Sequence, residues 1–415
     1  IGNPLRQQPA ASGKPAAEQG YRTTGIQDLA LIYQGGSHRL DWTVDEFRPY
    51  VVHRFADGSK DWLFDGFLFL EFKDGSGRNY TVGYEKLNAR RTEWEWLLDR
   101  IFEQGKSLSA LDRCIGQEIK ELGKPAFRHQ IVLGLPEAIR GQKDWGEIDG
   151  REMDFSKEED QIAATKWYIG ELVERFKAAK YKHLELSGFY WVAEDTHHCA
   201  ELTIPLSEYI HSEGKLFYWI PYWQAKGHEE WKRLGFDVAY QQPNHFFNHS
   251  IPDSRLDEAC ATARRHGMAM EFEFDEKATA AIPNSSHDRM AAYINHFEKN
   301  DVFNSSAVAY YCGNRGVLTL DESDNPKDKA LMDRLARIIQ ARRYLKYGIP
   351  MKNKTRVVAH RGFWHTDGSA QNSIASLLKA DQLGVYGVEF DVWMASDGVP
   401  VLNHDGWHDG YEVQS

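Results

Sequence analysis

The sequence predicts an α/β protein whose large domain is a (β/α)8, TIM-barrel-like fold, followed by the first βα units of a second, incomplete barrel. Eight short apolar or β-branched runs alternate with longer helical stretches between residues 26 and 346, and a new strand pattern begins at Arg356. Strands alternating with helices form parallel βαβ units, and eight such units suit a closed barrel. An open doubly wound sheet is the alternative, although no glycine-rich dinucleotide motif follows the first strand.

Each element has its own local signal. The clearest helices are 157–180 and 326–346, where apolar residues recur at helical spacing. The helix at 254–266 has Asp253 or Ser254 as its N-cap and Gly267 as its stop. The expected strands are 28–36, 62–72, 129–136, 183–192, 215–223, 237–243, 267–274 and 307–314. The remaining expected helices are 90–122, 197–213, 227–234 and 286–299.

The expected domain plan has four parts, which are a leader at 1–25, the barrel at 26–346, a linker at 347–355 and the second domain at 356–415. The leader is rich in Pro, Ala, Gly and Gln, a composition typical of flexible segments. Because the chain begins with Ile1 rather than Met, we expect that a targeting segment lay upstream. The protein is then expected to be secreted, periplasmic or on the cell surface.

Composition excludes several classes of protein. The 415 residues carry a net charge of -11, which repels phosphate backbones and argues against nucleic-acid binding. No apolar run is long enough for a membrane span, so we expect no integral membrane protein. The four cysteines form no CxxC pair, which argues against a zinc knuckle and leaves free thiols or disulfides open.

Polar residues stand where the expected strands of the C-terminal segment end. Glu389 and Asp391 are two apart on one strand and therefore project from one face, as a Mg²⁺ or Ca²⁺ site requires. His360 and His404 can exchange protons with a phosphodiester near neutral pH. Arg361 can hold phosphate oxygens through its planar fork. Each residue alone is ordinary on a surface, but the five together predict a site.

This segment resembles the glycerophosphodiester phosphodiesterase family. The matching motifs are His360-Arg361-Gly362, Asn372-Ser373, Glu389-Phe390-Asp391-Val392, Asp397-Gly398 and His404-Asp405. The resemblance implies a divalent cation and hydrolysis of glycerophosphodiesters to an alcohol and glycerol phosphate. It also implies that His360 and His404 form an acid/base pair and that Glu389 and Asp391 are metal ligands. Arg361 and Asn372 would bind the substrate.

Two departures from the family pattern shape the expectation. Gln371 stands where the family usually has Glu, and the family's further metal ligand would follow Ser415. Only about a quarter to a third of such a domain is present, since the fold typically needs about 250 residues. We therefore expect that this truncated segment is catalytically inactive by itself.

The large domain offers carboxylates at strand ends, where barrel enzymes place their sites. Glu194 follows the fourth expected strand, and Glu271 and Glu273 alternate with apolar residues of the seventh so that both point inward. We hypothesise a glycoside hydrolase with Glu194 as acid/base and Glu273 as nucleophile. A purely structural network of the inward acids is about equally favoured. Asp65 becomes the acid if the strand count is wrong by one.

Aromatic residues near the same rim, including Tyr222 and Trp223, are expected to stack on sugar rings. Residues 26–346 also resemble an uncharacterised family, domain of unknown function 4855, of secreted polysaccharide-associated proteins. That likeness rests on DLALIYQGGSHRLDW (28–42), WLFDGFLFLEF (62–72), GFYWVAED (188–195) and PYWQAKGHEEWKRLGFDVAYQQPNHFF (221–247). The expected substrates are a glycerophosphodiester or phosphorylated glycan, with polysaccharide as a further partner. In the alternative, the large domain is a non-catalytic carbohydrate-binding module.

Overall fold

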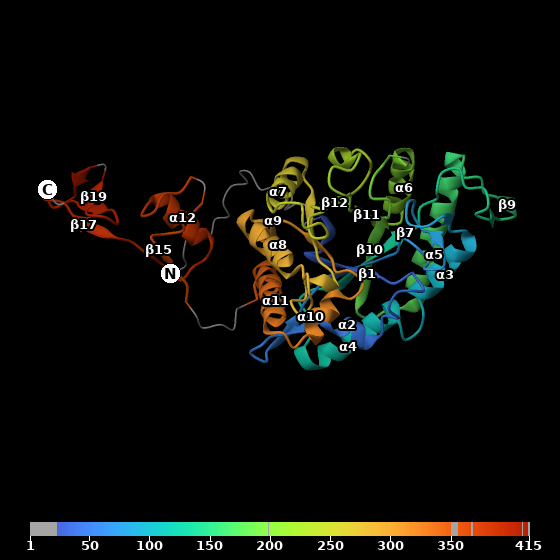
Figure 1. The fold of residues 1–415 in the computed structure, drawn as a ribbon, viewed down its shortest axis with the longest axis horizontal. Coiled ribbons are helices and arrows are strands. Elements are labelled where there is room, and N and C mark those ends of the chain that lie inside the picture. Colours follow the sequence, from blue (N-terminus) through green and yellow to red (C-terminus); the bar gives the residue numbers. More distant parts are fainter. Residues whose placement is uncertain (1–22, 198, 350–355, 367, 409, 414–415) are drawn as a thin grey trace. The chain divides into compact units, whose positions relative to one another are not determined.

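The computed structural model divides the chain into two compact units, residues 1–348 and 349–415 (Figure 1). The described residues are 23–197, 199–349, 356–366, 368–408 and 410–413. Most of the expected leader and of the expected linker lie outside them. Each unit is described by itself.

Eight parallel strands close the barrel of the first unit, and their spatial order follows the chain. They are β1 (Asp28–Tyr33), β4 (Gly66–Leu70), β7 (His129–Leu135), β10 (Leu184–Trp191), β11 (Leu216–Trp219), β12 (Val238–Gln241), β13 (Ala269–Glu273) and β14 (Val308–Tyr311). The first and last strands pair directly, with Ala30 opposite Tyr310. This closure confirms the barrel and excludes the open sheet.

Helices surround the barrel (Figure 1). They are α2 (Val44–Val51), α3 (Arg91–Ile101), α4 (Ser107–Leu122), α5 (Glu158–Ala179), α6 (Ala200–Ser212), α7 (Ser254–His266), α8 (His287–Lys299), α9 (Val302–Ser305), α10 (Gly316–Glu322) and α11 (Pro326–Tyr347). The expected helix at 90–122 is two helices, separated by a turn in which Gly105 has φ 79°. Within the described residues, no helix combines the length and apolarity that a bilayer crossing needs.

Short elements fill the connections. They are the two-stranded sheets β2 (Val52–Arg54) with β3 (Lys60–Trp62), β5 (Arg78–Asn79) with β6 (Leu87–Asn88), and β8 (Glu147–Ile148) with β9 (Arg151–Glu152), and the 3-10 helices η1 (His228–Glu230) and η2 (Glu276–Ala278). The helix expected at 227–234 is wrong, because only η1 forms there. Gly227 and Gly235, with φ 89° and 91°, bracket that turn and prevent a longer helix.

The alternation in β13 decides which way its acids point. Phe272 packs outward against Tyr293 and Phe297 of α8, with ring centroids 5.0 and 5.6 Å apart. Because neighbouring residues of a strand face opposite sides, Glu271 and Glu273 point into the barrel. The sequence-based expectation for these two residues is therefore correct in orientation.

Asp65 lies at the opposite, N-terminal end of the barrel. Its carboxylate accepts backbone hydrogen bonds from Gln27, at 3.0 Å, and from Asp28, at 2.8 Å. Asp28 is itself held by Arg342 at 3.0 Å. Asp65 therefore organises the base of the barrel. The alternative that made it the catalytic acid is wrong, because the strand count is right.

The second unit contains one βαβ unit, β15 (Val358–His360), α12 (Ile374–Gln382) and β16 (Gly387–Glu389), whose two strands are parallel. The expectation that Glu389 and Asp391 lie on one strand is wrong, because β16 ends at Glu389. The following strands are antiparallel pairs, β17 (Val392–Met394) with β18 (Pro400–Leu402) and β19 (Trp407–His408) with β20 (Tyr411–Glu412). The βαβ unit agrees with the expected start of a second barrel.

Candidate active site

A cavity of about 440 Å³ lies at the C-terminal ends of the barrel strands. Three carboxylates line it, Glu194 after β10 and Glu271 and Glu273 on β13. These strands are the fourth and the seventh of the barrel. The structure thus brings both predicted catalytic acids, Glu194 and Glu273, to one cavity.

Glu194 is half-buried at the cavity wall. Its Oε1 accepts a hydrogen bond from Nε2 of Gln242 at 2.8 Å. Burial raises the pKa of Glu194 to about 7, and the charge of Asp195 adds to the rise while Gln242 opposes it. A carboxyl group with this pKa can carry a proton at neutral pH, as a general acid must.

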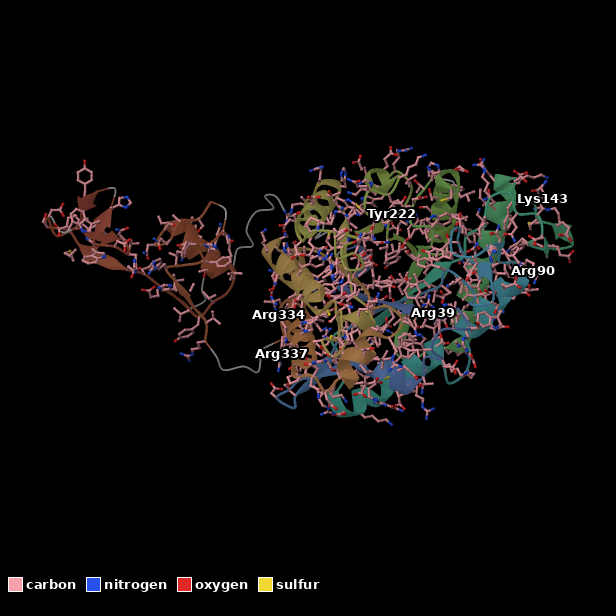
Figure 2. The ribbon with its side chains drawn as sticks, viewed as in Figure 1. Arg39, Arg90, Lys143, Tyr222, Arg334 and Arg337 are labelled. Carbon is pink, nitrogen blue, oxygen red and sulfur yellow. The ribbon has the colours of Figure 1, made fainter. Side chains whose placement is uncertain are left out.

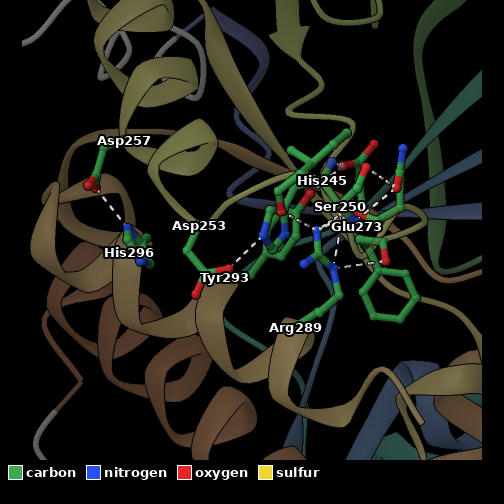
Figure 3. A network of polar contacts seen from close by, with 11 residues as sticks. His245, Ser250, Asp253, Asp257, Glu273, Arg289, Tyr293 and His296 are labelled. Carbon is green, nitrogen blue, oxygen red and sulfur yellow. Dashed lines mark hydrogen bonds and ion pairs between the residues drawn. The ribbon is translucent and has the colours of Figure 1, made fainter. Parts of the chain in front are cut away.

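Glu273 accepts hydrogen bonds from several neighbouring groups of the protein (Figure 3). The phenolic hydroxyl of Tyr293 donates to its Oε2, the backbone N–H of His245 donates to the same oxygen at 3.2 Å, and Nδ2 of Asn244 lies 3.3 Å from Oε1. Burial raises the pKa of Glu273 to about 7, whereas the bonds from Tyr293 and His245 lower it. Three donors on one carboxylate favour its ionised form.

Glu271 is the third acid of the cavity. Burial, followed by the charges of Glu273 and Glu194, raises the pKa of Glu271 well above its ordinary value. Glu194 and Glu273 are the two acids that the sequence predicted to act in catalysis.

Two amides connect Glu194 with Glu273. Nδ2 of Asn244 donates to Oε1 of Gln242 at 2.9 Å, and these side chains in turn contact Glu273 and Glu194. Asn244 adopts φ 49°, a left-handed conformation that Asn tolerates better than most residues. Backbone strain held by this network fits a preorganised site.

Aromatic side chains form the cavity walls, but they are not the ones predicted. Tyr222 donates its hydroxyl to Asp195 at 3.0 Å, and the ring of Trp223 lies under Arg255 at 4.8 Å. Neither lines the cavity, so their expected role in stacking on substrate has no geometric support there. The aromatic residues that line it are Tyr33, Phe72, Tyr84, Tyr190, Phe247 and Tyr311.

Two cations of the cavity escaped sequence reasoning. Arg39 forms a two-bond pair with Glu71, with both N–O distances 3.0 Å, and its guanidinium lies 4.8 Å from the Tyr33 ring. Lys73 pairs with Glu85 at 3.5 Å. Arg39 and Tyr222 belong to different loops around the barrel (Figure 2). No spacing pattern in the sequence indicates that such loop residues line the cavity.

In the second unit, four predicted residues cluster around Arg361. Its backbone N–H donates to Glu389 at 3.1 Å, and its Nε lies 3.4 Å from Oδ2 of Asp391. Asn372 and Asp391 exchange two hydrogen bonds, at 3.1 and 3.2 Å. His360 lies opposite Glu389 in the strand pair, with Nε2 4.0 Å from its carboxylate. Both acids therefore contact Arg361, Glu389 through its backbone N–H and Asp391 through its guanidinium.

His404 makes different contacts. Its Nδ1 pairs with Asp405 at 2.8 Å, and its carbonyl accepts from the Trp393 indole at 3.3 Å. Among the described residues, none of its hydrogen bonds or ion pairs is with the Arg361 cluster. The structure therefore leaves the predicted pairing of His404 with His360 unsupported.

The first unit is thus a (β/α)8 barrel protein with an acidic cavity at the catalytic end of its fold. The chain belongs to the family described as Domain of unknown function (DUF4855), whose model matches residues 28–337. Residues 360–410 match the Glycerophosphoryl diester phosphodiesterase family. Both resemblances seen in the sequence are confirmed.

Three curated relatives match a short part of this chain. Glycerophosphodiester phosphodiesterase 1 of Rattus norvegicus and that of Mus musculus are each 39% identical over 67 residues, which is 16% of this chain and 19% of the relative. The Homo sapiens protein is 39% identical over 54 residues, covering 13% of this chain and 16% of its own. The chain therefore spans about a fifth of the length of the curated relatives it matches.

Solved structures share the fold only distantly. An endo-beta-1,4-glucanase of glycoside hydrolase family 5 from Bacillus licheniformis has TM-score 0.41 at 12% identity, covering 83% of this chain and 64% of its own. A family 18 chitinase from Pseudoalteromonas aurantia has TM-score 0.38 at 11% identity, covering 74% and 99%. Tryptophan synthase subunit alpha from Legionella pneumophila scores 0.36 at 8%, covering 80% and 100%. Since a synthase scores like the glycosidases, these likenesses do not bear on the reaction.

Proposed function

We propose that the barrel is a glycoside hydrolase in which Glu194 is the general acid/base and Glu273 the nucleophile. One observation carries this proposal, namely that a half-buried carboxylate after the fourth strand, Glu194, and a buried one on the seventh, Glu273, share one cavity at the C-terminal end of the barrel. Burying a carboxylate costs free energy, so carboxylates buried in a cavity usually serve a function. The aromatic walls of the cavity offer faces on which sugar rings can stack.

The two acids differ in the way that the reaction requires. Glu194, with one amide donor, holds the proton that the leaving oxygen needs. Glu273, with three donors, holds the negative charge that attacks the anomeric carbon. A covalent glycosyl intermediate on Glu273 forms as the glycosidic bond breaks. Glu194 then takes a proton from the water that hydrolyses this intermediate.

A panel of aryl glycosides and polysaccharides tests the proposal. Glu194→Gln is expected to slow hydrolysis by roughly 10²–10⁴-fold, least for substrates with good leaving groups. Azide should restore turnover of such substrates by Glu194→Ala, because it attacks the glycosyl intermediate without base assistance. Glu185→Gln is the control, since this acid lies on β10, the strand that precedes Glu194, and is exposed. Carbohydrate binding without any hydrolysis would instead support the non-catalytic module.

A second candidate function concerns the C-terminal segment, because residues 360–410 match a phosphodiesterase family. We propose that His360 and the Arg361 cluster contribute to a site for a phosphodiester. Glu389 and Asp391 both contact Arg361, and their carboxylate oxygens are ligands of the kind that Mg²⁺ or Ca²⁺ prefers. A cation held there would polarise phosphoryl oxygens. Arg361 would orient the same oxygens through its guanidinium.

A measurement of cation binding distinguishes a phosphodiester site from a cluster whose role is purely structural. Calorimetric titration of the chain with Mg²⁺ or Ca²⁺ should show a site that Glu389→Gln and Asp391→Asn remove. Asp397→Asn, on the turn between β17 and β18, is the control. Equal cation binding by all variants would contradict the assignment of ligands.

A further inference from the structure

A second cluster of ligand-type side chains lies in the barrel unit, outside the acidic cavity. It consists of His228 and Glu229, on η1, and His266, the last residue of α7. One atom of each, the two imidazole Nε2 atoms and a carboxylate oxygen of Glu229, all lie within 4.8 Å of one another. None of the three lines the acidic cavity.

The ligand atoms of these three side chains are too far apart to form hydrogen bonds with one another. Oε1 of Glu229 lies 3.6 Å from Nε2 of His266 and 4.0 Å from Nε2 of His228, both beyond hydrogen-bond length. Nε2 of His266 is buried and has no hydrogen-bond partner among the described residues. Since buried polar groups are normally satisfied, this arrangement leaves room for something between the three atoms.

The tautomer of His228 is already the one that a metal needs. Its Nδ1 lies 2.6 Å from the carbonyl oxygen of Ala225, and because a carbonyl only accepts, Nδ1 must carry the hydrogen. Nε2 therefore presents a lone pair toward Glu229 and His266. Metal-binding histidines typically donate their other N–H to a carbonyl or carboxylate in this way.

The backbone of His266 is held in place at the end of α7. Its carbonyl accepts a hydrogen bond from the Trp231 indole at 2.9 Å, which ties the end of α7 to the β11–β12 connection. The same connection carries His228 and Glu229, so the ligands on both sides of the cluster are joined by a second contact.

We propose that His228, Glu229 and His266 bind a divalent transition metal, with Zn²⁺ the best fit, as a structural clamp. Two imidazoles and one carboxylate are a recurrent zinc ligand set, and a water can complete the tetrahedron. Zn–N and Zn–O distances of about 2.0–2.2 Å place tetrahedral ligands roughly 3.3–3.5 Å apart. The observed separations need only small side-chain rotations to reach that geometry.

The clamp has a structural purpose in this barrel. The β11–β12 connection contains only the three-residue η1 where other connections carry full helices. A metal shared by η1 and the end of α7 would fix this short connection to its neighbour. Mg²⁺ should not substitute, because it prefers oxygen ligands.

Metal analysis of the full chain tests the proposal without reference to activity. The protein is stripped with a chelator, equilibrated with Zn²⁺ and dialysed, and its zinc content and unfolding temperature are measured. We expect His228→Ala, His266→Ala and Glu229→Gln each to hold one zinc fewer than the wild type. Zinc affinity should fall by at least about a hundredfold, more than the loss of an outer-shell partner costs.

Two variants keep the result interpretable. Glu229→Gln alters a carboxylate that is 63% exposed, so it should fold normally even if the histidine variants do not. His211→Ala is the control, since this histidine pairs with Asp237 at 2.8 Å outside the cluster. Equal zinc content in wild type and Glu229→Gln would overturn the proposal, as would a zinc-induced rise in unfolding temperature that all variants share.

Discussion

Tyr293 of α8 donates its hydroxyl to the carboxylate of Glu273 at the end of β13. Both groups are fully buried, and the backbone N–H of His245 reaches the same carboxylate oxygen (Figure 3). The outer helix layer thus sets the charge of an acid inside the barrel. This relationship makes the state of Glu273 testable through a residue that does not line the cavity.

Tyr293→Phe removes this hydrogen bond and keeps the ring. Because the bond favours ionised Glu273, its loss should raise the pKa of Glu273 and move the acidic limb of the pH–rate profile upward by about one pH unit. Tyr310→Phe is the control, since Tyr310 donates to a different buried acid, Asp28, at 2.8 Å. An acidic limb that stays in place in Tyr293→Phe would contradict the role of Glu273.

The pH–rate profile of the wild type should itself be narrow and centred near neutrality. Hydrolysis needs Glu273 ionised and Glu194 protonated, and burial raises the pKa of each to about 7. Below that pH Glu273 gains a proton, and above it Glu194 loses one, so the rate falls on both sides. Activity that keeps rising above pH 9 would exclude Glu194 as the acid.

The free energy of unfolding should also depend on the protonation of Glu194. The pKa of Glu194 rises from 4.5 in the unfolded chain to about 7 in the folded protein. A raised pKa in the folded state stabilises at low pH, and that stability, on the order of 3 kcal/mol, is lost as pH rises from about 4.5 to 7. Glu194→Gln should remove this part of the pH dependence of unfolding, whereas Glu185→Gln should leave it intact. The measurement is denaturant unfolding at several pH values.

The sequence predicted the barrel well for a physical reason. In a (β/α)8 barrel the spatial order of strands follows the chain, so eight apolar runs counted along the sequence place Glu194 just after the fourth strand and Glu273 on the seventh. Strand alternation then orients Glu271 and Glu273. Both inferences use local periodicity, which a single sequence contains.

What the sequence missed comes from loops and from contacts between distant segments. Phe247 and Tyr84 reach the cavity from connections whose paths no periodicity encodes. Tyr222 and Trp223 were misplaced because strand ends do not reveal how the following loop turns. His228 and His266 are far apart in sequence and match no metal-binding spacing, so only the fold brings them together.

Arg289 should control the loop that carries Phe247. Its guanidinium donates to four backbone carbonyls of this loop, those of His245, Phe246, Asn248 and Ile251. Lysine cannot make these bonds at once, so Arg289→Lys should speed amide hydrogen exchange within residues 245–251. Arg334→Lys, which alters an exposed pair with Glu298, is the control. Unchanged exchange in Arg289→Lys would show that the loop is held by other contacts.

Gly362 tests the C-terminal unit separately from the barrel. It adopts φ 81°, and a Cβ there would lie 2.2 Å from Oγ and 2.9 Å from the backbone carbon of Ser376 in α12. Gly362→Ala should therefore cost more than about 1 kcal/mol and separate α12 from the Arg361 turn. Hydrogen exchange should accelerate within residues 358–389, while the unfolding transition of the barrel stays unchanged. Gly398→Ala is the matched control, because it has φ 85° but no atom within 4 Å of the added Cβ. If both variants behave alike, backbone strain alone explains the effect, and the close approach of Gly362 to α12 contributes nothing.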